Sequence, residues 1–361
     1  MKDTVKKNWM IYGANGYTGA LIAEAAAGSS MRRPVLAGRN ASQIQALASR
    51  LDCEARVFDL SSDSDVIAKQ IEDCAVVLHC AGPFAFTAKP MAEACMKAKT
   101  AYCDITGEIG VFQSLHEMDA NARHAGVLLL PGVGFDVVPT DCVARTVYEQ
   151  MPAAVSLRLA FAGLSHISAG TMRSALLGLA DDSVVRKDGR LTSIPYFSRT
   201  AQIDLTDRTE TYHAIPWGDV FTAFVSTGIP NIEVFTTVPS SQRLLLGALM
   251  PLRSLLGRSR ARSFFGALGK MLSPLVKGPD ETVRRTARAR IEGLGMDGRG
   301  HTLCLRLETQ EGYAFTVESA LAAVRRILDG RLEKGHETGF QTPSLAFGSN
   351  FVFEVGLTRW L

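Results

Sequence analysis

The chain lacks the sequence patterns that mark several large classes of protein. It has no Cys-x-x-Cys pair or other zinc-ligand spacing, so we predict no metal site. Its 39 basic and 36 acidic residues leave a net charge of only +3, which gives no electrostatic reason to expect a nucleic-acid partner. The GxSxG, HExxH and Walker spacings are absent, and no tyrosine is followed four positions later by the lysine that short-chain reductases need. These absences favour chemistry carried by an organic cofactor.

Cysteine usage and the N-terminal residues bear on the compartment. The seven cysteines are odd in number and mostly lie in apolar runs, a pattern that predicts free thiols in a reducing compartment and hence a cytoplasmic protein. Lys2, Lys6 and Lys7 precede an apolar stretch, but Gly13 interrupts it within a few residues. We therefore expect a first strand there and no signal peptide. A chain of 361 residues is long enough for two domains.

The stretch from Trp9 to Ala27 reads as strand, glycine turn and helix. Its glycines have a GxxGxxG spacing. Gly13 permits the tight turn, Gly16 lets the backbone approach a pyrophosphate, and Gly19 lets the helix lie close to the sheet. The free N–H groups of that helix would face the anion, and Thr18 adds a hydroxyl donor.

The stretch from Pro34 to Asn40 reads as a second short strand, and Arg39 is the residue that closes it. Enzymes that use NAD typically carry Asp or Glu at this point for the ribose 2′-hydroxyl, whereas a guanidinium suits a 2′-phosphate. The sequence therefore predicts NADP(H) rather than NAD. Asp59 closes a third strand at a position where adenine contacts are often made, and a solvated turn aspartate is the alternative.

Strands and helices alternate up to about residue 130, which predicts a Rossmann-type doubly wound parallel sheet over 1–148. The fourth strand, 75–79, empties into a Gly-Pro loop at the carboxyl edge of that sheet, where it can line the nicotinamide side of the cofactor. His79 and Cys80 close this apolar strand, and we expect core packing for both. The predicted cofactor contacts are Gly13, Asn15, Gly16, Tyr17, Thr18, Gly19, Arg39, Asn40, Asp59, Ala81, Gly82, Pro83 and Phe84.

Five motifs occur in a fixed order: GANGYTG, LAGRN, CAGPF, AYCDITGE and PGVGFDVVPTD, the last spanning 131–141. Together they resemble the saccharopine dehydrogenase-like oxidoreductases, including the trans-acting enoyl reductase branch. The resemblance covers about the first 145 residues. It implies an NADP-binding domain whose loops at Gly82, 104–108 and 134–136 border the active cleft. It also implies a second domain, and the TP-x-x-x-x-G stretch at 342–348 resembles the family's closing segment.

The second half predicts an α+β domain over 149–338 with a mostly antiparallel sheet, followed by a segment, 339–361, that packs back towards the cofactor domain. The expected strands are 155–162, 220–226, 232–238, 287–294, 301–309 and 313–317, and a helix is expected to start at Ser168 or Gly170. Between 242 and 277 two apolar runs flank a basic linker. They are too short to span a membrane. Contact with a membrane surface, an acyl channel, another subunit of a homodimer or their own domain all stay open.

The chemistry left is hydride transfer, in which the protein positions and polarises the substrate. Asp104, Asp136 and Tyr17 are the candidate catalytic groups, with Glu108 and His213 as further titratable residues near the predicted cleft. We expect an NADPH-dependent oxidoreductase that reduces an enoyl, imine or carbonyl group of an apolar or acyl-type substrate. A catalytically idle NADP-binding sensor or scaffold is the alternative. The mostly apolar second half argues against amino acid substrates of the saccharopine type.

Overall fold

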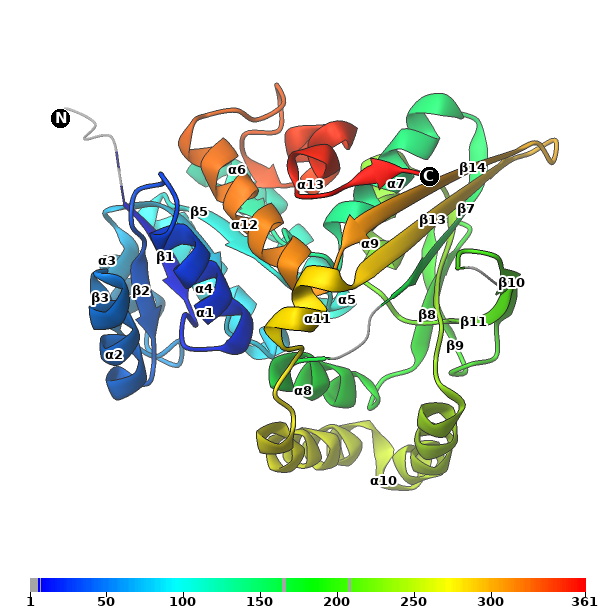
Figure 1. The fold of residues 1–361 in the computed structure, drawn as a ribbon, viewed down its shortest axis with the longest axis horizontal. Coiled ribbons are helices and arrows are strands. Elements are labelled where there is room, and N and C mark those ends of the chain that lie inside the picture. The colour runs from blue at the N-terminus through cyan, green and yellow to red at the C-terminus, as the bar shows by residue number, and fades with distance from the viewer. Residues whose placement is uncertain (1–5, 7, 164–166, 207–208) are drawn as a thin grey trace. The chain divides into compact units, whose positions relative to one another are not determined.

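The computed structural model describes residues 6, 8–163, 167–206 and 209–361, and within helix α10 it describes side chains from residue 256 onwards (Figure 1). The chain divides into two compact units. Residues 1–142 and 313–356 make up the first, and residues 143–312 and 357–361 make up the second. The sequence predicts a boundary at 338, whereas the structure groups 313–338 with the first unit.

The first unit is built on a seven-stranded sheet in the order β15-β6-β5-β4-β1-β2-β3, in which every neighbouring pair is parallel. Its strands are β1 (Asn8–Tyr12), β2 (Val35–Gly38), β3 (Ala55–Val57), β4 (Cys74–His79), β5 (Ala101–Asp104), β6 (Leu128–Leu130) and β15 (Gly339–Phe340). The run 3-2-1-4-5-6 is the order of a dinucleotide-binding doubly wound sheet. The predicted Rossmann-type fold is confirmed. Residues 339–340, in the tail, extend this sheet beside β6.

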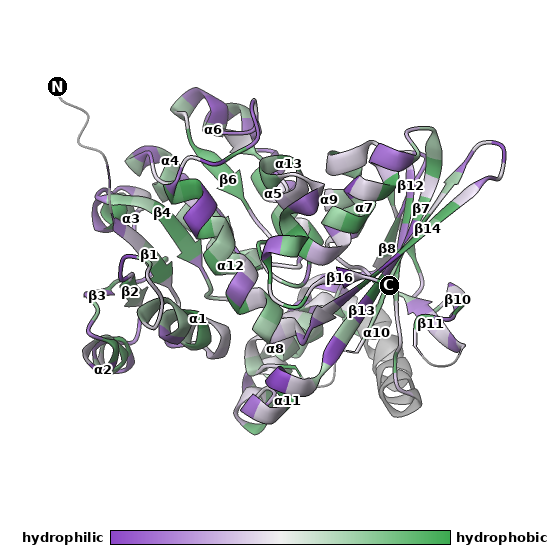
Figure 2. Ribbon diagram, turned by 45° about the horizontal axis from the view of Figure 1, so that its top comes forward, coloured by the Kyte–Doolittle hydropathy of each residue, from purple (hydrophilic) through white to green (hydrophobic). Residues whose placement is uncertain are grey.

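The central strands are apolar on both faces because helices cover both sides of a parallel sheet. Ile11 in β1 and Val76 and Leu78 in β4 are fully buried. Figure 2 shows β1, β4 and β6 in the green of apolar residues. This double burial explains why the strands read as continuous apolar runs in the sequence.

The helices of the first unit follow the strands. They are α1 (Tyr17–Ala27), α2 (Ala41–Leu51), α3 (Ser64–Ile71), α4 (Phe84–Ala98), α5 (Ile109–His116), α6 (Asp119–Ala125), α7 (Val138–Gln150, which crosses the boundary between the units), α12 (Gly312–Leu328), α13 (Pro343–Phe347) and the 3-10 helix η2 (Ser349–Glu354). Polar caps start three of them: the side chains of Asn40, Asp63 and Thr342 accept hydrogen bonds from the first-turn N–H groups of α2, α3 and α13.

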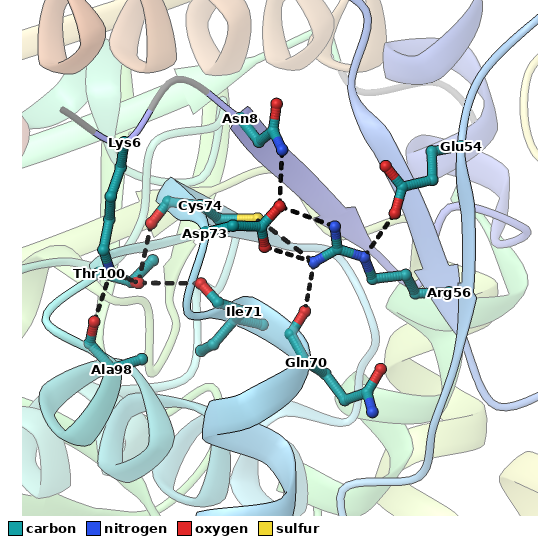
Figure 3. A network of polar contacts seen from close by, with 10 residues as sticks. All are labelled: Lys6, Asn8, Glu54, Arg56, Gln70, Ile71, Asp73, Cys74, Ala98 and Thr100. Atoms are coloured by element: carbon teal, nitrogen blue, oxygen red, sulfur yellow. Dashed lines mark hydrogen bonds and ion pairs between the residues drawn. The ribbon is translucent and has the colours of Figure 1, made fainter. Parts of the chain in front are cut away.

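A polar network ties the amino-terminal edge of the sheet together, at the edge opposite to the expected cofactor (Figure 3). Arg56 of β3 donates to both carboxylate oxygens of Asp73, at 2.6 and 2.8 Å, and to the carbonyl of Gln70. Asn8 at the start of β1 donates to the same carboxylate. The hydrogen bond from Arg56 holds the pKa of Asp73 well below its usual range. A bidentate pair of this kind fixes geometry as well as charge.

The second unit is built on a nine-stranded mixed sheet. Its strands are β7 (Ala154–Ala162), β8 (Ser183–Lys187), β9 (Arg190–Ile194), β10 (Thr200–Ile203), β11 (Glu210–Ala214), β12 (Asn231–Thr236), β13 (Arg288–Asp297), β14 (Thr302–Gln310) and β16 (Arg359–Trp360). The β12–β7 pair is parallel and the other described pairs are antiparallel, as predicted. Its helices are α8 (Ala169–Gly178), α9 (Asp219–Thr227), α10 (Ser240–Leu272), η1 (Ser273–Leu275) and α11 (Glu281–Thr286).

Two predicted strands of the second half are helical. Residues 220–226 lie in α9, and residues 313–317 open α12. The β-branched and aromatic residues of both stretches favour a strand locally, but tertiary packing overrides that preference. In α9 the hydroxyls of Ser226 and Thr227 donate to the carbonyls four residues back, which a strand does not allow.

Most of the segment 242–277 belongs to α10, which consists of two helical segments. Gly257 has φ 71° and ψ 159° in the middle of α10, so two helical segments meet there at a kink. The second segment packs on α8. No helix in the described part of the chain is both long and apolar enough to cross a bilayer.

Candidate functional site

The candidate site lies at the carboxyl-terminal edge of the first unit's sheet, where strand order reverses between β1 and β4. The two strands end side by side: Tyr12 pairs with His79, and Cys80 N–H donates to the Tyr12 carbonyl at 2.7 Å. Ligands of doubly wound sheets bind outside the carboxyl ends at such a reversal. The loops that leave these two strands are therefore the first place to look for a cofactor.

The glycine turn after β1 leaves no room for side chains at two of its positions. Gly13 has φ +82°, and a Cβ on it would lie 2.7 Å from the backbone nitrogen of Ala81. A Cβ on Gly19 would lie 2.3 Å from the Gly13 carbonyl oxygen, so α1 starts directly against the turn. Gly16 is the N-cap of α1 and has no side chain to cap the first turn, which also contains no acidic residue. This cradle fits a pyrophosphate held by backbone N–H groups.

The end of β2 presents the polar groups expected at the adenosine side. Arg39 and Asn40 are both exposed. Asn40 Oδ1 accepts the Gln43 N–H at 3.2 Å, and the Gln43 side chain accepts Asn15 Nδ2 at 2.7 Å. The structure thus brings Asn15, from the glycine turn, together with the start of α2. The guanidinium of Arg39 is open to solvent at this point.

Asp59 follows β3 and is exposed. Its carboxylate accepts the N–H of Ser61 at 2.8 Å, and this bond, more than the charge of Arg39, lowers its pKa. The aspartate therefore shapes the turn after β3 and lies within electrostatic range of Arg39. An adenine contact by Asp59 stays a prediction.

The loop after β4 contains a cis peptide between Gly82 and Pro83, and α4 begins at Phe84. Glu108, which follows β5, reaches across to this helix. Its two carboxylate oxygens accept the backbone N–H groups of Phe84 and Ala85, at 3.0 and 2.9 Å. An acidic group at a helix N-terminus is favoured by the helix dipole. Glu108 therefore joins the loops after β4 and β5.

The burial and protonation states of His79 and Cys80, at the end of β4, argue against a role for either as base or nucleophile. His79 is fully buried, and burial lowers its pKa to about 3. The Thr87 hydroxyl donates to the Ala81 carbonyl, so it accepts from His79 Nε2 at 3.0 Å and the ring is neutral. Burial raises the pKa of the Cys80 thiol, which keeps it protonated. Both residues fit the core packing expected for them.

Asp104, at the end of β5, is fully buried and accepts three hydrogen bonds. They come from the Tyr102 hydroxyl at 2.6 Å and from the N–H groups of Thr106 and Gly132, both at 2.9 Å. Burial raises the pKa of Asp104 to about 6, and these bonds oppose that shift. The carboxylate links β5 with the loop after β6. This arrangement favours a positioning role over contact with a substrate.

Asp136 lies in the loop after β6 and is half-buried. Its Oδ2 is so close to Gly107 that a Cβ there would lie 2.8 Å away. Burial, with a smaller contribution from the negative charge of Glu108, raises the pKa of Asp136 to about 7. A carboxyl group with such a pKa can hold or release a proton at neutral pH, and perturbed groups of this kind gather at functional sites.

The first turns of α12 complete the site within the first unit. The rings of Tyr17 and Tyr313 meet edge to face, with centroids 5.1 Å apart. Thr316 Oγ1 accepts the Phe135 N–H at 3.0 Å, and Ser319 Oγ donates to the Val133 carbonyl at 2.8 Å. The loop that carries Asp136 is thus held by a helix some 180 residues further along the chain. Sequence reasoning missed this contribution because it interpreted 313–317 as a strand.

The described residues contain no group of three or more metal-ligating side chains. His213, a candidate from the second half, lies on β11 in the second unit and is buried, where its ring meets Phe197 edge to face. The structure therefore gathers Asp104, Glu108, Asp136 and Tyr17 in the first unit, and it does not place His213 there.

Comparisons with known proteins agree with the geometry of the first unit. Residues 9–130 match the family model of the saccharopine dehydrogenase NADP binding domain. A saccharopine dehydrogenase-like oxidoreductase of Rattus norvegicus is 27% identical over 202 residues, covering 49% of this chain and 47% of that protein. A trans-acting enoyl reductase of Mycobacterium leprae is 31% identical over 150 residues, covering 39% of this chain and 35% of that protein. The chain therefore matches about half or less of the length of these relatives.

Solved structures extend the likeness of fold to nearly the whole chain. The apo saccharopine dehydrogenase (L-Glu forming) of Saccharomyces cerevisiae has a TM-score of 0.66 at 15% identity, covering 98% of this chain and 100% of that one. The homospermidine synthase of Legionella pneumophila, solved with NAD, has a TM-score of 0.60 at 10% identity, covering 99% and 92%. At such identities the likeness shows the fold. The predicted resemblance and the predicted NADP-binding domain are confirmed by the family model and the relatives.

Proposed function

We propose that this chain, whose residues 9–130 form a saccharopine dehydrogenase-type NADP-binding domain, is an NADPH-dependent oxidoreductase that reduces an enoyl, imine or carbonyl group. The observation that carries the proposal is the pairing of the glycine cradle after β1 with an exposed guanidinium, Arg39, at the end of β2. The relatives named as oxidoreductase and enoyl reductase support the reaction class. The enoyl reductase among these relatives also supports a substrate of acyl type.

The cofactor contacts divide along the sheet edge. Gly13, Gly16 and Gly19, with Tyr17 and Thr18, would hold the pyrophosphate at the start of α1. Arg39 would grip the 2′-phosphate through its planar fork of donors, beside Asn40, Asn15 and Asp59. Ala81, Gly82, Pro83 and Phe84 would line the nicotinamide side. The bound cofactor supplies the hydride, and the protein's own part is to position and polarise the substrate.

Reduction of a conjugated C=C bond or of an imine also needs a proton, at the alpha carbon or at nitrogen. We assign its delivery to Asp136, because its pKa of about 7 keeps a large fraction of the carboxyl protonated at neutral pH. Asp104 acts on Asp136 indirectly, because it fixes the loop after β6 by accepting the Gly132 N–H. Tyr17, whose ring packs on Tyr313, belongs with the cofactor turn in this assignment.

The cysteines support a reducing compartment for this activity. None of the seven forms a disulfide, and those at 74, 95, 103 and 142 are buried. Structural disulfides are rare in the cytosol, where thiols are kept reduced. We propose a cytoplasmic location on this ground.

Deuterium transfer tests the proposed reaction directly. NADPH labelled with deuterium at C4 of the nicotinamide would be incubated with the protein and, in turn, an enoyl thioester, a cyclic imine and an aliphatic aldehyde. We expect label to appear in the reduced product of one class. Asp136→Asn should lower the rate of that transfer by about 100-fold, the range typical for loss of a general acid, while NADPH affinity stays the same.

Two results would contradict the proposal. If NADPH binds tightly but no class accepts deuterium, the chain is an NADP-binding sensor or scaffold. If Asp136→Asn transfers deuterium as fast as the wild type, the proton comes from another group. Asp119→Asn is a suitable control, because its carboxylate lies on α6 and pairs with Arg123 instead of facing the site loops.

A further inference from the structure

The region around α10 has an unusual distribution of charge. Between residues 234 and 279 the sequence contains no Asp or Glu at all. The same stretch carries seven basic residues: Arg243, Arg253, Arg258, Arg260, Arg262, Lys270 and Lys277. A run of one sign on an otherwise balanced chain, whose net charge is only +3, indicates a local electrostatic role.

The second segment of α10 has one face that is used within its own unit. Ala261 and Phe265 are fully buried and form a core cluster with Leu179 and Ala180, at the end of α8. Arg258 pairs with Asp181 at 2.6 Å beside this cluster. The helix is therefore anchored on the second unit through this face.

A flank of the same helix, beside the anchored face, carries a second apolar stripe. Phe264, Met271 and Leu275 are 40%, 67% and 76% exposed. Together with Ala267, also exposed, they follow the spacing that places residues on one side of a helix. Isolated exposed apolar side chains are ordinary, but a stripe of this kind marks an interaction surface.

Basic side chains lie on the same helical segment as the stripe. Arg260, Arg262, Lys270 and Lys277 are all exposed, and among the side chains that the structure describes none of the four forms an ion pair. An apolar stripe on a helix rich in Lys and Arg, within a stretch of sequence that contains no Asp or Glu, is the pattern of a helix that lies in the interface of a membrane with anionic lipids. Such a surface attracts the basic groups and accepts the apolar ones at the same time.

We propose that residues 258–277, the second segment of α10 with η1 and Lys277, form a docking surface for a lipid bilayer that contains anionic phospholipids. The helix would lie in the plane of the interface, held to its own unit through Phe265 and facing the lipid through Phe264, Met271 and Leu275. This inference goes beyond the proposed oxidoreductase function and does not depend on it.

Charge argues against a second copy of the chain as the occupant. In a symmetric dimer the same patch meets itself, so the basic residues of one copy would face those of the other. Like charges brought together in this way oppose association. An anionic surface has the complementary charge. The absence of a membrane-spanning helix in the described residues is consistent with a helix that rests on the surface.

Vesicle sedimentation tests the proposal with the full-length protein. The probes are vesicles of phosphatidylcholine alone and vesicles of roughly one part phosphatidylglycerol to two parts phosphatidylcholine. We expect binding to the anionic vesicles only, with a bound fraction that falls as salt increases. The double variant Met271→Asp/Leu275→Asp should weaken binding at least about tenfold, and Arg260→Ala/Lys270→Ala by about the same factor, with a shallower dependence on salt.

Matched controls come from the same unit. Met296→Asp changes another exposed apolar residue, and Lys187→Ala/Arg190→Ala removes two exposed charges from the β8–β9 hairpin. Both should bind vesicles like the wild type. All variants should keep the wild-type melting temperature and NADPH affinity, which separates this test from that of the proposed function.

Three results would overturn the proposal. The first is equal binding to neutral and anionic vesicles, and the second is no binding to either. The third is wild-type binding by Met271→Asp/Leu275→Asp. If that variant instead changes a monomer–dimer equilibrium in solution without vesicles, the stripe is a contact between copies of the chain.

Discussion

The glycine turn after β1 and the carboxylate cluster after β5 and β6 lie at the same edge of one sheet but are built in opposite ways. The turn consists of backbone. Side chains are excluded at Gly13 and Gly19, and Gly16, the N-cap of α1, has no side chain that could bind the N–H groups of the first turn. The cluster consists of side chains, with Asp104, Glu108 and Asp136 each placed by neighbouring loops.

This difference separates binding from chemistry. A cradle of backbone N–H groups offers a fixed field for an anion that never changes its charge, which suits a pyrophosphate. Burial raises the pKa values of Asp104 and Asp136, so these carboxyl groups can exchange protons, which suits the reacting end of a cofactor. The variants below test whether the two regions behave as differently as their construction suggests, starting with the largest expected effect.

Asp104→Ala should cost the most in stability. The substitution leaves the Tyr102 hydroxyl and the N–H groups of Thr106 and Gly132 without their buried acceptor. We expect the free energy of unfolding to fall by about 4 kcal/mol, since each unsatisfied buried group costs roughly 1–3 kcal/mol. Chemical denaturation measures it. A loss below about 1 kcal/mol would show that Asp104 does not hold the loops together.

Gly16→Val should act on binding and leave the fold intact. Its φ of −74° suits any residue, and an added Cβ would meet only the Gly13 carbonyl oxygen, at 3.3 Å. The valine would, however, stand where a pyrophosphate must approach. We expect NADPH affinity to fall by about 100-fold, equivalent to about 2.7 kcal/mol, with little change in melting temperature.

Gly28→Val, at the other end of α1, is the matched control for this variant. Its added Cβ would make only ordinary contacts, 3.6 Å from the Glu24 carbonyl oxygen. NADPH affinity should stay at the wild-type value. Equal affinities of Gly16→Val and the wild type would refute the assignment of the turn to phosphate binding.

Asp136→Asn should change how stability depends on pH. The folded pKa of about 7 lies above the ordinary value of 3.8, so burial of this carboxyl favours folding at low pH and that contribution is lost as the pH rises towards 7. The asparagine variant should therefore be more stable than the wild type at pH ~8, by about 1–3 kcal/mol, and equally stable near pH 4. Denaturation at the two pH values measures the difference. A constant difference would mean that the Asp136 pKa is not raised.

Glu108→Gln should have a small effect on stability and a clear effect on Asp136. Glutamine keeps one acceptor for the N–H groups of Phe84 and Ala85 but loses the charge at the start of α4, which costs about 1 kcal/mol. Removing that charge should also lower the pKa of Asp136. Titration of Asp136 by NMR would show it. An unchanged titration midpoint of Asp136 would show that the charge of Glu108 does not influence its pKa.

The two units also differ in how far their fold could be predicted from the sequence. In the first unit the strands are buried on both faces, and the turn after β1 has a characteristic glycine spacing. The alternation of apolar strands with helices, together with this spacing, therefore identifies the sheet. The contribution of Glu108 could not be predicted, because an acidic residue after a strand gives no sign of the helix end it will cap. The one signal in the sequence is that Glu108 follows β5, the strand that pairs with β4 and so lies next to the Gly-Pro loop.

The second unit was harder because its sheet has a polar face and its helices contain many β-branched residues. Glu292 on β13 pairs with Arg158 on β7 and Arg306 on β14, across three strands. Polar residues such as these alternate with apolar ones along β7, β13 and β14, and this period of two indicates strands in the sequence. Val220 and Phe315 belong to stretches that favour strands locally, yet α9 and α12 are stabilised by packing that only the folded chain supplies.

The most direct test of the account is a calorimetric titration of the wild type and Arg39→Ala with NADPH and with NADH at fixed salt. The wild type should prefer NADPH clearly. Arg39→Ala should lose about 10- to 100-fold in NADPH affinity, because the 2′-phosphate loses its charged partner, and should bind NADH within about twofold of the wild type. An equal loss for both cofactors, or no binding of either by the wild type, would contradict the assignment of this sheet edge to NADP(H).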